Sequence, residues 1–138
     1  MGLKLEAKIL IIDDMSTMRK IVRNMLNKMG YINLEEAEDG EPAWKIINEA
    51  ADAGTPYDFI VSDWNMPIMT GLDLLKNIRS SEKLKKLPFL MVTAEAEQAN
   101  VVIAVKAGVS NFIVKPFSIQ LLKEKIDNFY QEKYKSDF

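Results

Sequence analysis

The sequence predicts an α/β fold, a doubly wound parallel sheet of five strands with five helices. Short apolar runs without polar alternation follow one another along the chain, and such runs are typical of strands buried on both faces. Each run precedes a segment whose apolar residues recur at helical spacing. Because strand–helix–strand crossovers are right-handed, this alternation predicts one sheet covered on both faces. Five units are too few for a closed eight-stranded barrel.

Length and composition fit a single domain and exclude several classes of protein. The chain has 138 residues, 48% of them apolar, and we expect a core over about 8–131 with frayed ends at 1–7 and 132–138. Cys and His are absent, which excludes disulfides and metal sites built on thiolate or imidazole. The 18 basic and 20 acidic residues provide no basic surplus for nucleic acid.

No membrane contact is expected, and the default location is the cytoplasm. The longest unbroken apolar run, Val101–Val105, is far shorter than the ~20 residues of a membrane span. The first residues lack the apolar segment of a secretory signal.

The first strand–helix unit shows the pattern most clearly. Lys8–Ile12 is a continuous apolar run that ends in two aspartates, so we expect a strand there. The helical period begins at Ser16, which is a suitable N-cap. Gly30 can end this helix in the left-handed conformation.

Four further units follow by the same criteria. The second strand is the weakest, because Glu35 and Glu36 interrupt it, and Asp39-Gly40 after it is interpreted as a turn. The expected strands are 31–37, 58–62, 88–92 and 109–114. The expected helices are one with Pro42 in its first turn that reaches Ala50, then Gly71–Ser80, Glu95–Ala107, and a last one capped by Ser118 that extends to about Tyr130.

Polar residues follow four of the five strands. Asp13 and Asp14 follow the first, Asp63 the third, Thr93 the fourth and Lys115 the fifth. Ligands of open α/β sheets bind at the carboxyl ends of the strands, where these side chains should meet. Taken one at a time, each residue has an ordinary structural role. Thr93 is common in strands, Lys115 would be solvated, and an aspartate at a strand end often forms a turn or caps a helix. Together, three crowded carboxylates repel one another, so the cluster requires a cation or a cationic side chain between them.

Mg²⁺ is the cation that fits, because it binds one or two carboxylates together with phosphate oxygens. A carboxylate can also act as a nucleophile and hold an aspartyl-phosphate. In phosphoryl transfer, catalysis is mostly the positioning of groups and the neutralisation of charge. Lys115 could neutralise one phosphoryl oxygen and the Thr93 hydroxyl could donate to another. The constellation therefore indicates phosphoryl chemistry.

Four segments together resemble response-regulator receiver domains, most closely the single-domain chemotaxis regulators. These are Asp13-Asp14-Met15-Ser16-Thr17-Met18-Arg19, Asp63-Trp64-Asn65-Met66-Pro67, Thr93-Ala94-Glu95 and Lys115-Pro116-Phe117. The resemblance covers nearly the whole chain and implies a flavodoxin-like fold and a signalling protein rather than an enzyme. It also implies a cis Lys115-Pro116 peptide.

The resemblance implies a role for each residue at this edge. Asp63 matches the phosphoacceptor, which a histidine kinase would phosphorylate. Asp13 and Asp14 match the acidic pair that holds Mg²⁺, for which Mn²⁺ is an expected substitute, with the Asn65 backbone carbonyl as a further ligand. We expect Asp14 and Asp63 to bind the cation directly and Asp13 to act through water. Lys115 matches the phosphate partner.

The switch and output residues show one departure from the family. Thr93 matches the switch hydroxyl, but the aromatic switch position, often Tyr in chemotaxis regulators, is Phe112. An inward and outward ring movement stays open, as does a fixed core ring. The expected output surface comprises Val101, Val105 and Lys125. Each residue of a helix is turned by ~100° from the one before, so the five residues of the 101–105 run cannot all face the core. This favours an exposed partner surface over a helix enclosed by its neighbours.

Alternative functions remain at this point. The motor-switch protein of the flagellum is one expected partner, and a histidine phosphotransfer protein in a phosphorelay is the alternative; a phosphatase is a further expected partner, and the chain is expected to be a monomer. A haloacid-dehalogenase-type phosphatase is disfavoured, because Asn65 stands where that motif has Asp. Only Gln131–Phe138 follows the last expected helix, too little for a DNA-binding module.

Overall fold

The computed structural model describes residues 4–94, 102–103, 105–109 and 111–136, with no side chains described beyond 127. Over this part of the chain it confirms the predicted fold class. Five parallel strands form one sheet in the order β2-β1-β3-β4-β5. The strands are β1 (Ile9–Ile12), β2 (Leu34–Ala37), β3 (Phe59–Asp63), β4 (Phe89–Thr93) and β5 (Asn111–Val114).

Four helices are assigned over the described residues, where five were expected. They are α1 (Ser16–Lys28), α2 (Gly40–Asp52), α3 (Gly71–Ser80) and α5 (Ile119–Ser136). The helix expected over Glu95–Ala107 falls largely outside the described residues, although 102–103 and 105–106 are helical. Among the described residues, no helix combines the length and apolar character that crossing a membrane requires.

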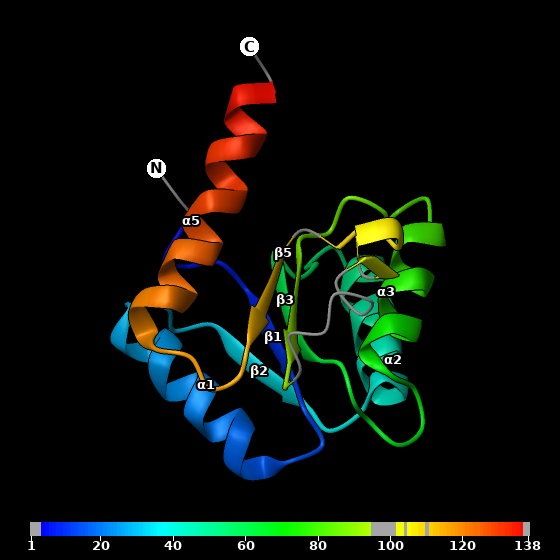
Figure 1. The fold of residues 1–138 in the computed structure, drawn as a ribbon. Helices are drawn as coiled ribbons and strands as arrows, with labels where there is room; N and C mark the ends of the chain where they lie inside the picture. The colour runs from blue at the N-terminus through cyan, green and yellow to red at the C-terminus, as the bar shows by residue number, and fades with distance from the viewer. Residues whose placement is uncertain (1–3, 95–101, 104, 110, 137–138) are drawn as a thin grey trace.

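The sheet separates two hydrophobic cores, with α1 and α5 on one face and α2 and α3 on the other (Figure 1). Because successive strand residues point to opposite faces, neighbours in one strand belong to different cores. In β3, Phe59 and Val61 pack toward α1 and α5, whereas Ile60 packs toward α2 and α3. This double burial explains why the central strands are continuous apolar runs.

Two helix starts and one helix end test the predicted caps. Ser16 is wrong as an N-cap, because it is already helical and Met15 precedes it without a side-chain cap. Ser118 is confirmed, since its hydroxyl accepts a hydrogen bond from the Leu121 N–H at 3.1 Å. Gly30 is also confirmed, with φ of 103° just after α1.

Several boundaries differ from expectation. β2 begins at Leu34 rather than Tyr31, because the Tyr31 N–H donates to the Leu26 carbonyl at 3.0 Å and so belongs to the end of α1. β5 begins at Asn111 rather than Val109. α5 continues to Ser136, beyond the expected end at Tyr130. Asp39-Gly40 forms the start of α2 rather than a free turn, with Asp39 as the N-cap.

Candidate functional site

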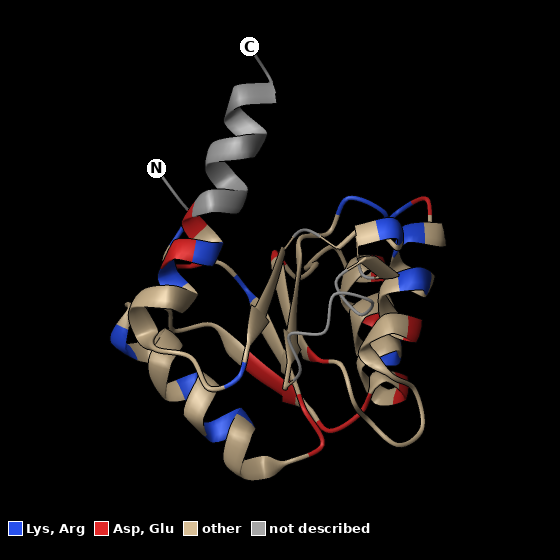
Figure 2. Cartoon of the chain, in the orientation of Figure 1, with Lys and Arg blue, Asp and Glu red and all other residues tan. Residues whose placement is uncertain are grey.

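The register of the sheet brings three carboxylates to its carboxyl end. Ile12 of β1 pairs with Ser62 of β3, so the next residue of each strand is an aspartate, Asp13 and Asp63. Both are buried, whereas Asp14 is exposed. One oxygen from each of the three lies within 4.8 Å of the others. Figure 2 shows acidic residues gathered at this lower end of the sheet.

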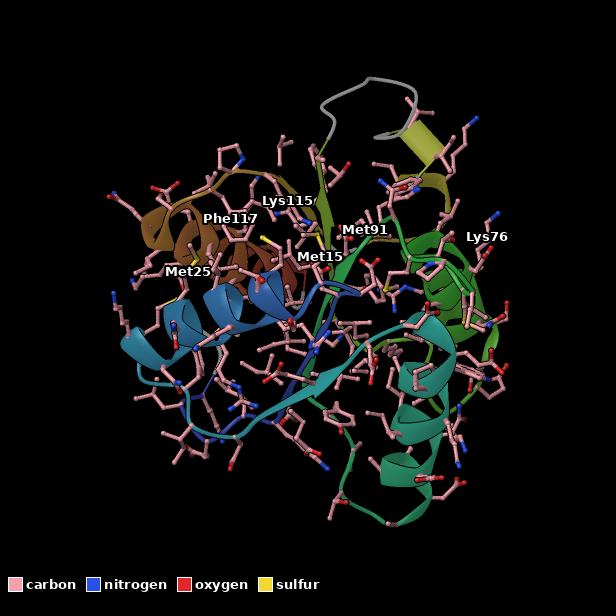
Figure 3. All side chains as sticks on the ribbon, turned by 90° about the horizontal axis from the view of Figure 1, so that it is seen from below. Met15, Met25, Lys76, Met91, Lys115 and Phe117 are labelled. Atoms are coloured by element: carbon pink, nitrogen blue, oxygen red, sulfur yellow. The ribbon has the colours of Figure 1, made fainter. Side chains whose placement is uncertain are left out.

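Lys115, directly after β5, provides the cation of the cluster. Its Nζ lies 3.2 Å from Asp63 Oδ1 and 3.4 Å from Asp13 Oδ2. Figure 3 looks onto this end of the molecule, and Lys115 is labelled near its centre beside Met15. Since β5 is separated from β3 by β4, only a long side chain can make this contact. The peptide Lys115-Pro116 is cis, as the resemblance implied.

The charges of the cluster do not balance. Burial raises the pKa of Asp63, and the negative charge of Asp13 raises it further, while Lys115 opposes both effects. Three carboxylates share one ammonium, which leaves an excess of negative charge among hard oxygen donors. A divalent cation with a preference for oxygen ligands, such as Mg²⁺, fits this donor set.

Thr93 ends the strand next to that of Asp63, and Asn65 follows Asp63 by two residues in the chain. Thr93 is the last residue of β4, the strand beside β3, and it is buried. The Lys115 N–H donates to the Thr93 carbonyl at 2.8 Å, which ties the ends of β4 and β5 together. Asn65 is exposed at the start of the loop after β3.

The expected switch and output residues are only partly brought together. Phe112 is partly buried against the core under α2 and α3, and the Lys125 Nζ lies 5.2 Å from its ring centroid. Val105 is 61% exposed, and Val102 and Ile103 beside it are also exposed. This agrees with an uncovered apolar surface. Val101 lies outside the described residues.

Two residues that support the acidic edge were missed by sequence reasoning. Arg19 donates to the Asp13 carbonyl at 2.7 Å and to Glu36 at 3.1 Å, so it fixes the backbone of the acidic pair against β2. Gly71 has no room for a side chain, since a Cβ would meet the Asp63 carbonyl oxygen. Neither contact shows in a local sequence pattern. The Arg19 contacts depend on how α1 lies against the ends of β1 and β2, and the Gly71 contact depends on how the loop after β3 turns back onto Asp63.

The family model of the response regulator receiver domain matches residues 9–127. The chain belongs to the response-regulator receiver family. The match includes both strands that provide the acidic cluster and the strand that precedes Lys115. The receiver family consists of signalling domains rather than classical enzymes.

The curated relatives of this chain include chemotaxis proteins. The chain is 51% identical over 124 residues to chemotaxis protein CheY-3 of Vibrio cholerae serotype O1, covering 90% of this chain and 92% of that protein. It is 49% identical to chemotaxis protein CheY of Pseudomonas aeruginosa, covering 90% and 96% respectively. These similarities identify the group of receivers that the chain resembles in sequence.

Solved structures agree with the receiver fold. The structure of Vibrio cholerae CheY4 matches with a TM-score of 0.80 at 32% identity, covering 90% of this chain and 98% of that one. The receiver domain of the Pseudomonas aeruginosa sensor histidine kinase PA1611, which has a magnesium ion coordinated in its active-site cleft, matches with a TM-score of 0.78. At 24% identity that second likeness concerns the fold alone.

Proposed function

We propose that this receiver accepts a phosphoryl group on Asp63 from a histidine kinase, or from a small donor such as acetyl phosphate, and signals by binding proteins. The observation that supports this most directly is the placement of Asp63, a buried carboxylate held 3.2 Å from the Lys115 ammonium beside two more carboxylates. This arrangement provides a nucleophile and a group that neutralises phosphoryl charge.

Mg²⁺ belongs to this proposal as the resident cation, with Mn²⁺ as a substitute. Asp14 and Asp63 would hold it directly, the Asn65 carbonyl would be a further ligand, and Asp13 would act through water. The oxygen donors and their excess negative charge support this assignment. When bound, the cation supplies neutralisation of charge on a phosphoryl oxygen.

The chain's own residues perform the transfer. An Asp63 carboxylate oxygen attacks phosphorus and forms an O–P bond, while the bond from phosphorus to the donor breaks and its electron pair stays with the donor. Lys115 neutralises a phosphoryl oxygen, and the Thr93 hydroxyl donates to another. The same groups assist hydrolysis, in which a water oxygen attacks phosphorus, a proton of that water passes to solvent, and the Asp63 carboxylate leaves with the electron pair of the broken O–P bond.

The proposed output is control of the flagellar motor switch by the phosphorylated form. The relatives named as chemotaxis proteins, about 50% identical over 90% of the chain, support this choice. Passage of the phosphoryl group to a histidine phosphotransfer protein stays the second candidate, because Phe112 differs from the family's frequent Tyr. A phosphatase as a partner, a monomeric state and a cytoplasmic location remain predictions, as does a single domain over 1–138.

The test compares the unmodified protein with Asp63→Asn after treatment with acetyl phosphate and Mg²⁺. We expect phosphate incorporation only in the unmodified protein, measured by intact mass in acid. A pull-down with the phosphorylated form then asks whether a motor-switch peptide or a phosphotransfer domain is retained. Undiminished incorporation in Asp63→Asn would place the acceptor elsewhere.

Thr93 and Phe112 are proposed to transmit the modification to the output surface of Val101, Val105 and Lys125. The phosphoryl group would draw the Thr93 hydroxyl toward it, and the Phe112 ring would move into the space that is vacated. Thr93→Ala should still be phosphorylated but should lose most of the partner's preference for the phosphorylated form. Full retention of that preference would exclude this route.

A further inference from the structure

Asp39 is a buried carboxylate that joins two distant parts of the chain. It lies directly before α2, yet its Oδ1 accepts a hydrogen bond from the Met69 N–H at 2.9 Å and its Oδ2 accepts one from the Ile68 N–H at 3.2 Å. A third, longer bond of 3.4 Å comes from the Glu41 N–H. Two of these three bonds therefore go to the β3–α3 loop (residues 64–70), not to its own helix.

These bonds involve a charged group. Burial alone would raise the pKa of Asp39, but the backbone N–H groups of Met69, Ile68, Glu41 and Gly40 outweigh that effect and lower it. The carboxylate is therefore ionised at neutral pH. Hydrogen bonds to an ionised acceptor are about twice as strong as those between neutral groups.

The packing around these bonds is close. A Cβ built on Gly40 would lie 2.5 Å from the Met69 carbonyl oxygen and 2.9 Å from the Met69 Cβ. The start of α2 and the far half of the β3–α3 loop are thus in direct backbone contact, which a glycine beside Asp39 permits.

Asn65 lies in the first part of the same loop, next to β3, whereas Ile68 and Met69 lie in its second part. The Trp64 N–H donates to the Val92 carbonyl of β4 at 2.9 Å, and the Met66 side chain is buried in the core. The Gly71 N–H returns to the Trp64 carbonyl at 2.9 Å, closing the loop. Asn65 therefore lies in a loop fixed to the sheet at its base and to Asp39 at its far half.

From this arrangement we propose that Asp39 is a positioning residue, which holds the β3–α3 loop so that the Asn65 carbonyl faces the cation bound by Asp14 and Asp63. The inference rests on the proposed function, because it presupposes the cation. Its specific content is that Asp39, without touching the cation, sets how tightly the cation binds.

Asp39→Ser is the decisive variant. Serine still caps α2 at the Glu41 N–H, but it is neutral and too short to reach the loop. In the metal-free protein, the amides of Ile68 and Met69 should exchange with solvent about tenfold faster. The half-saturating Mg²⁺ concentration should rise about tenfold, followed by fluorescence in a Trp44→Phe background where Trp64 is the only tryptophan.

A merely structural defect predicts a different pattern. We expect phosphate incorporation at saturating Mg²⁺ to stay within about twofold of the unmodified protein, because the loop then regains its position. General damage to the fold would lower the saturated level as well, and that result would overturn the inference. If Asp39→Ser does not fold, Asp39→Asn keeps the shape and one acceptor oxygen, and a smaller rise in half-saturation is expected.

Asp58→Asn is the matched control. Its carboxylate accepts a hydrogen bond from the Lys8 N–H at 2.8 Å at the opposite end of the sheet, so it has the same chemistry away from the site. It should leave the Mg²⁺ response unchanged. Unaltered Mg²⁺ half-saturation in Asp39→Ser, with Asp14→Ala still abolishing the response, would overturn the inference alone. No Mg²⁺ response in the unmodified protein would instead overturn the proposed function.

Discussion

The two ends of the sheet solve the problem of charge in opposite ways. At the amino end, the Lys8 Nζ lies 3.0 Å from the Thr55 carbonyl, 3.7 Å from Glu35 and 4.5 Å from the Tyr57 ring centroid. The Lys8 N–H in turn donates to Asp58. At the carboxyl end, three carboxylates meet the single ammonium of Lys115.

The difference separates a structural arrangement from a functional one. At the amino end Glu35 lies beside the Lys8 ammonium and Asp58 accepts from the Lys8 N–H, and both carboxylates are exposed to solvent. At the carboxyl end, Asp13 and Asp63 are buried with a surplus of like charge, which costs stability. The proposed Mg²⁺ would relieve this cost, because the cation neutralises the surplus carboxylates.

The largest expected effect comes from crowding the carboxyl end. Gly71→Ala should lower the free energy of unfolding by about 3 kcal/mol, because the new Cβ meets the Asp63 carbonyl oxygen. Gly54, between α2 and β3 at the amino end, has φ of 81° and nothing within 4 Å of a built Cβ, so Gly54→Ala should cost only about 1 kcal/mol. Urea unfolding measures both, and equal costs would contradict the close packing at Asp63.

A divalent cation should stabilise the folded protein through the carboxyl end of the sheet and not through the amino end. Binding to the native state raises its stability by ~2.7 kcal/mol at a hundred times the dissociation constant. We expect the melting temperature to rise with Mg²⁺, and Asp14→Ala to abolish the rise, whereas Asp58→Ala should keep it. If Mg²⁺ leaves the melting temperature of the unmodified protein unchanged, the carboxyl end of the sheet does not bind the cation.

Removing the ammonium at each end gives the next contrast. Lys115→Met keeps the aliphatic stem but leaves Asp13 and Asp63 buried without a cation, and it should destabilise the metal-free protein by about 2 kcal/mol. Lys8→Met removes a more exposed charge, so a loss of at most about 1 kcal/mol is expected. Mg²⁺ should restore part of the loss for Lys115→Met only, as thermal melts with and without the cation would show.

The smallest effect depends on pH. Because the pKa of Asp63 is raised in the folded protein, its contribution to stability is greatest at low pH and is lost as pH rises through that pKa. Asp63→Asn should therefore make the metal-free protein more stable near pH 7, where the folded state holds the carboxyl ionised at a cost. The gain should shrink as pH falls through the raised pKa. If the difference in stability between the variant and the unmodified protein stays constant across this pH range, the pKa of Asp63 is not raised in the folded protein.

Strands buried on both faces could be predicted from the sequence. The start of a strand with exposed residues was predicted less accurately. Phe59-Ile60-Val61 is apolar because both faces are covered, so its place in the chain was evident. β2 is an edge strand whose Glu35 and Glu36 are exposed, and its start was placed too early. The Ser16 cap failed because a local preference cannot show which residue the preceding turn leaves outside the helix.

The sequence by itself determined the alternation of strands and helices and the polar residues at the strand ends, because both are local patterns. Only the tertiary structure decided their partners. Lys115 meets Asp13 across 102 positions of the chain, and Asp39 meets Met69 across 30. Such pairs depend on the order and register of the strands, which are set by how both faces of the sheet are buried. No short stretch of sequence contains that information.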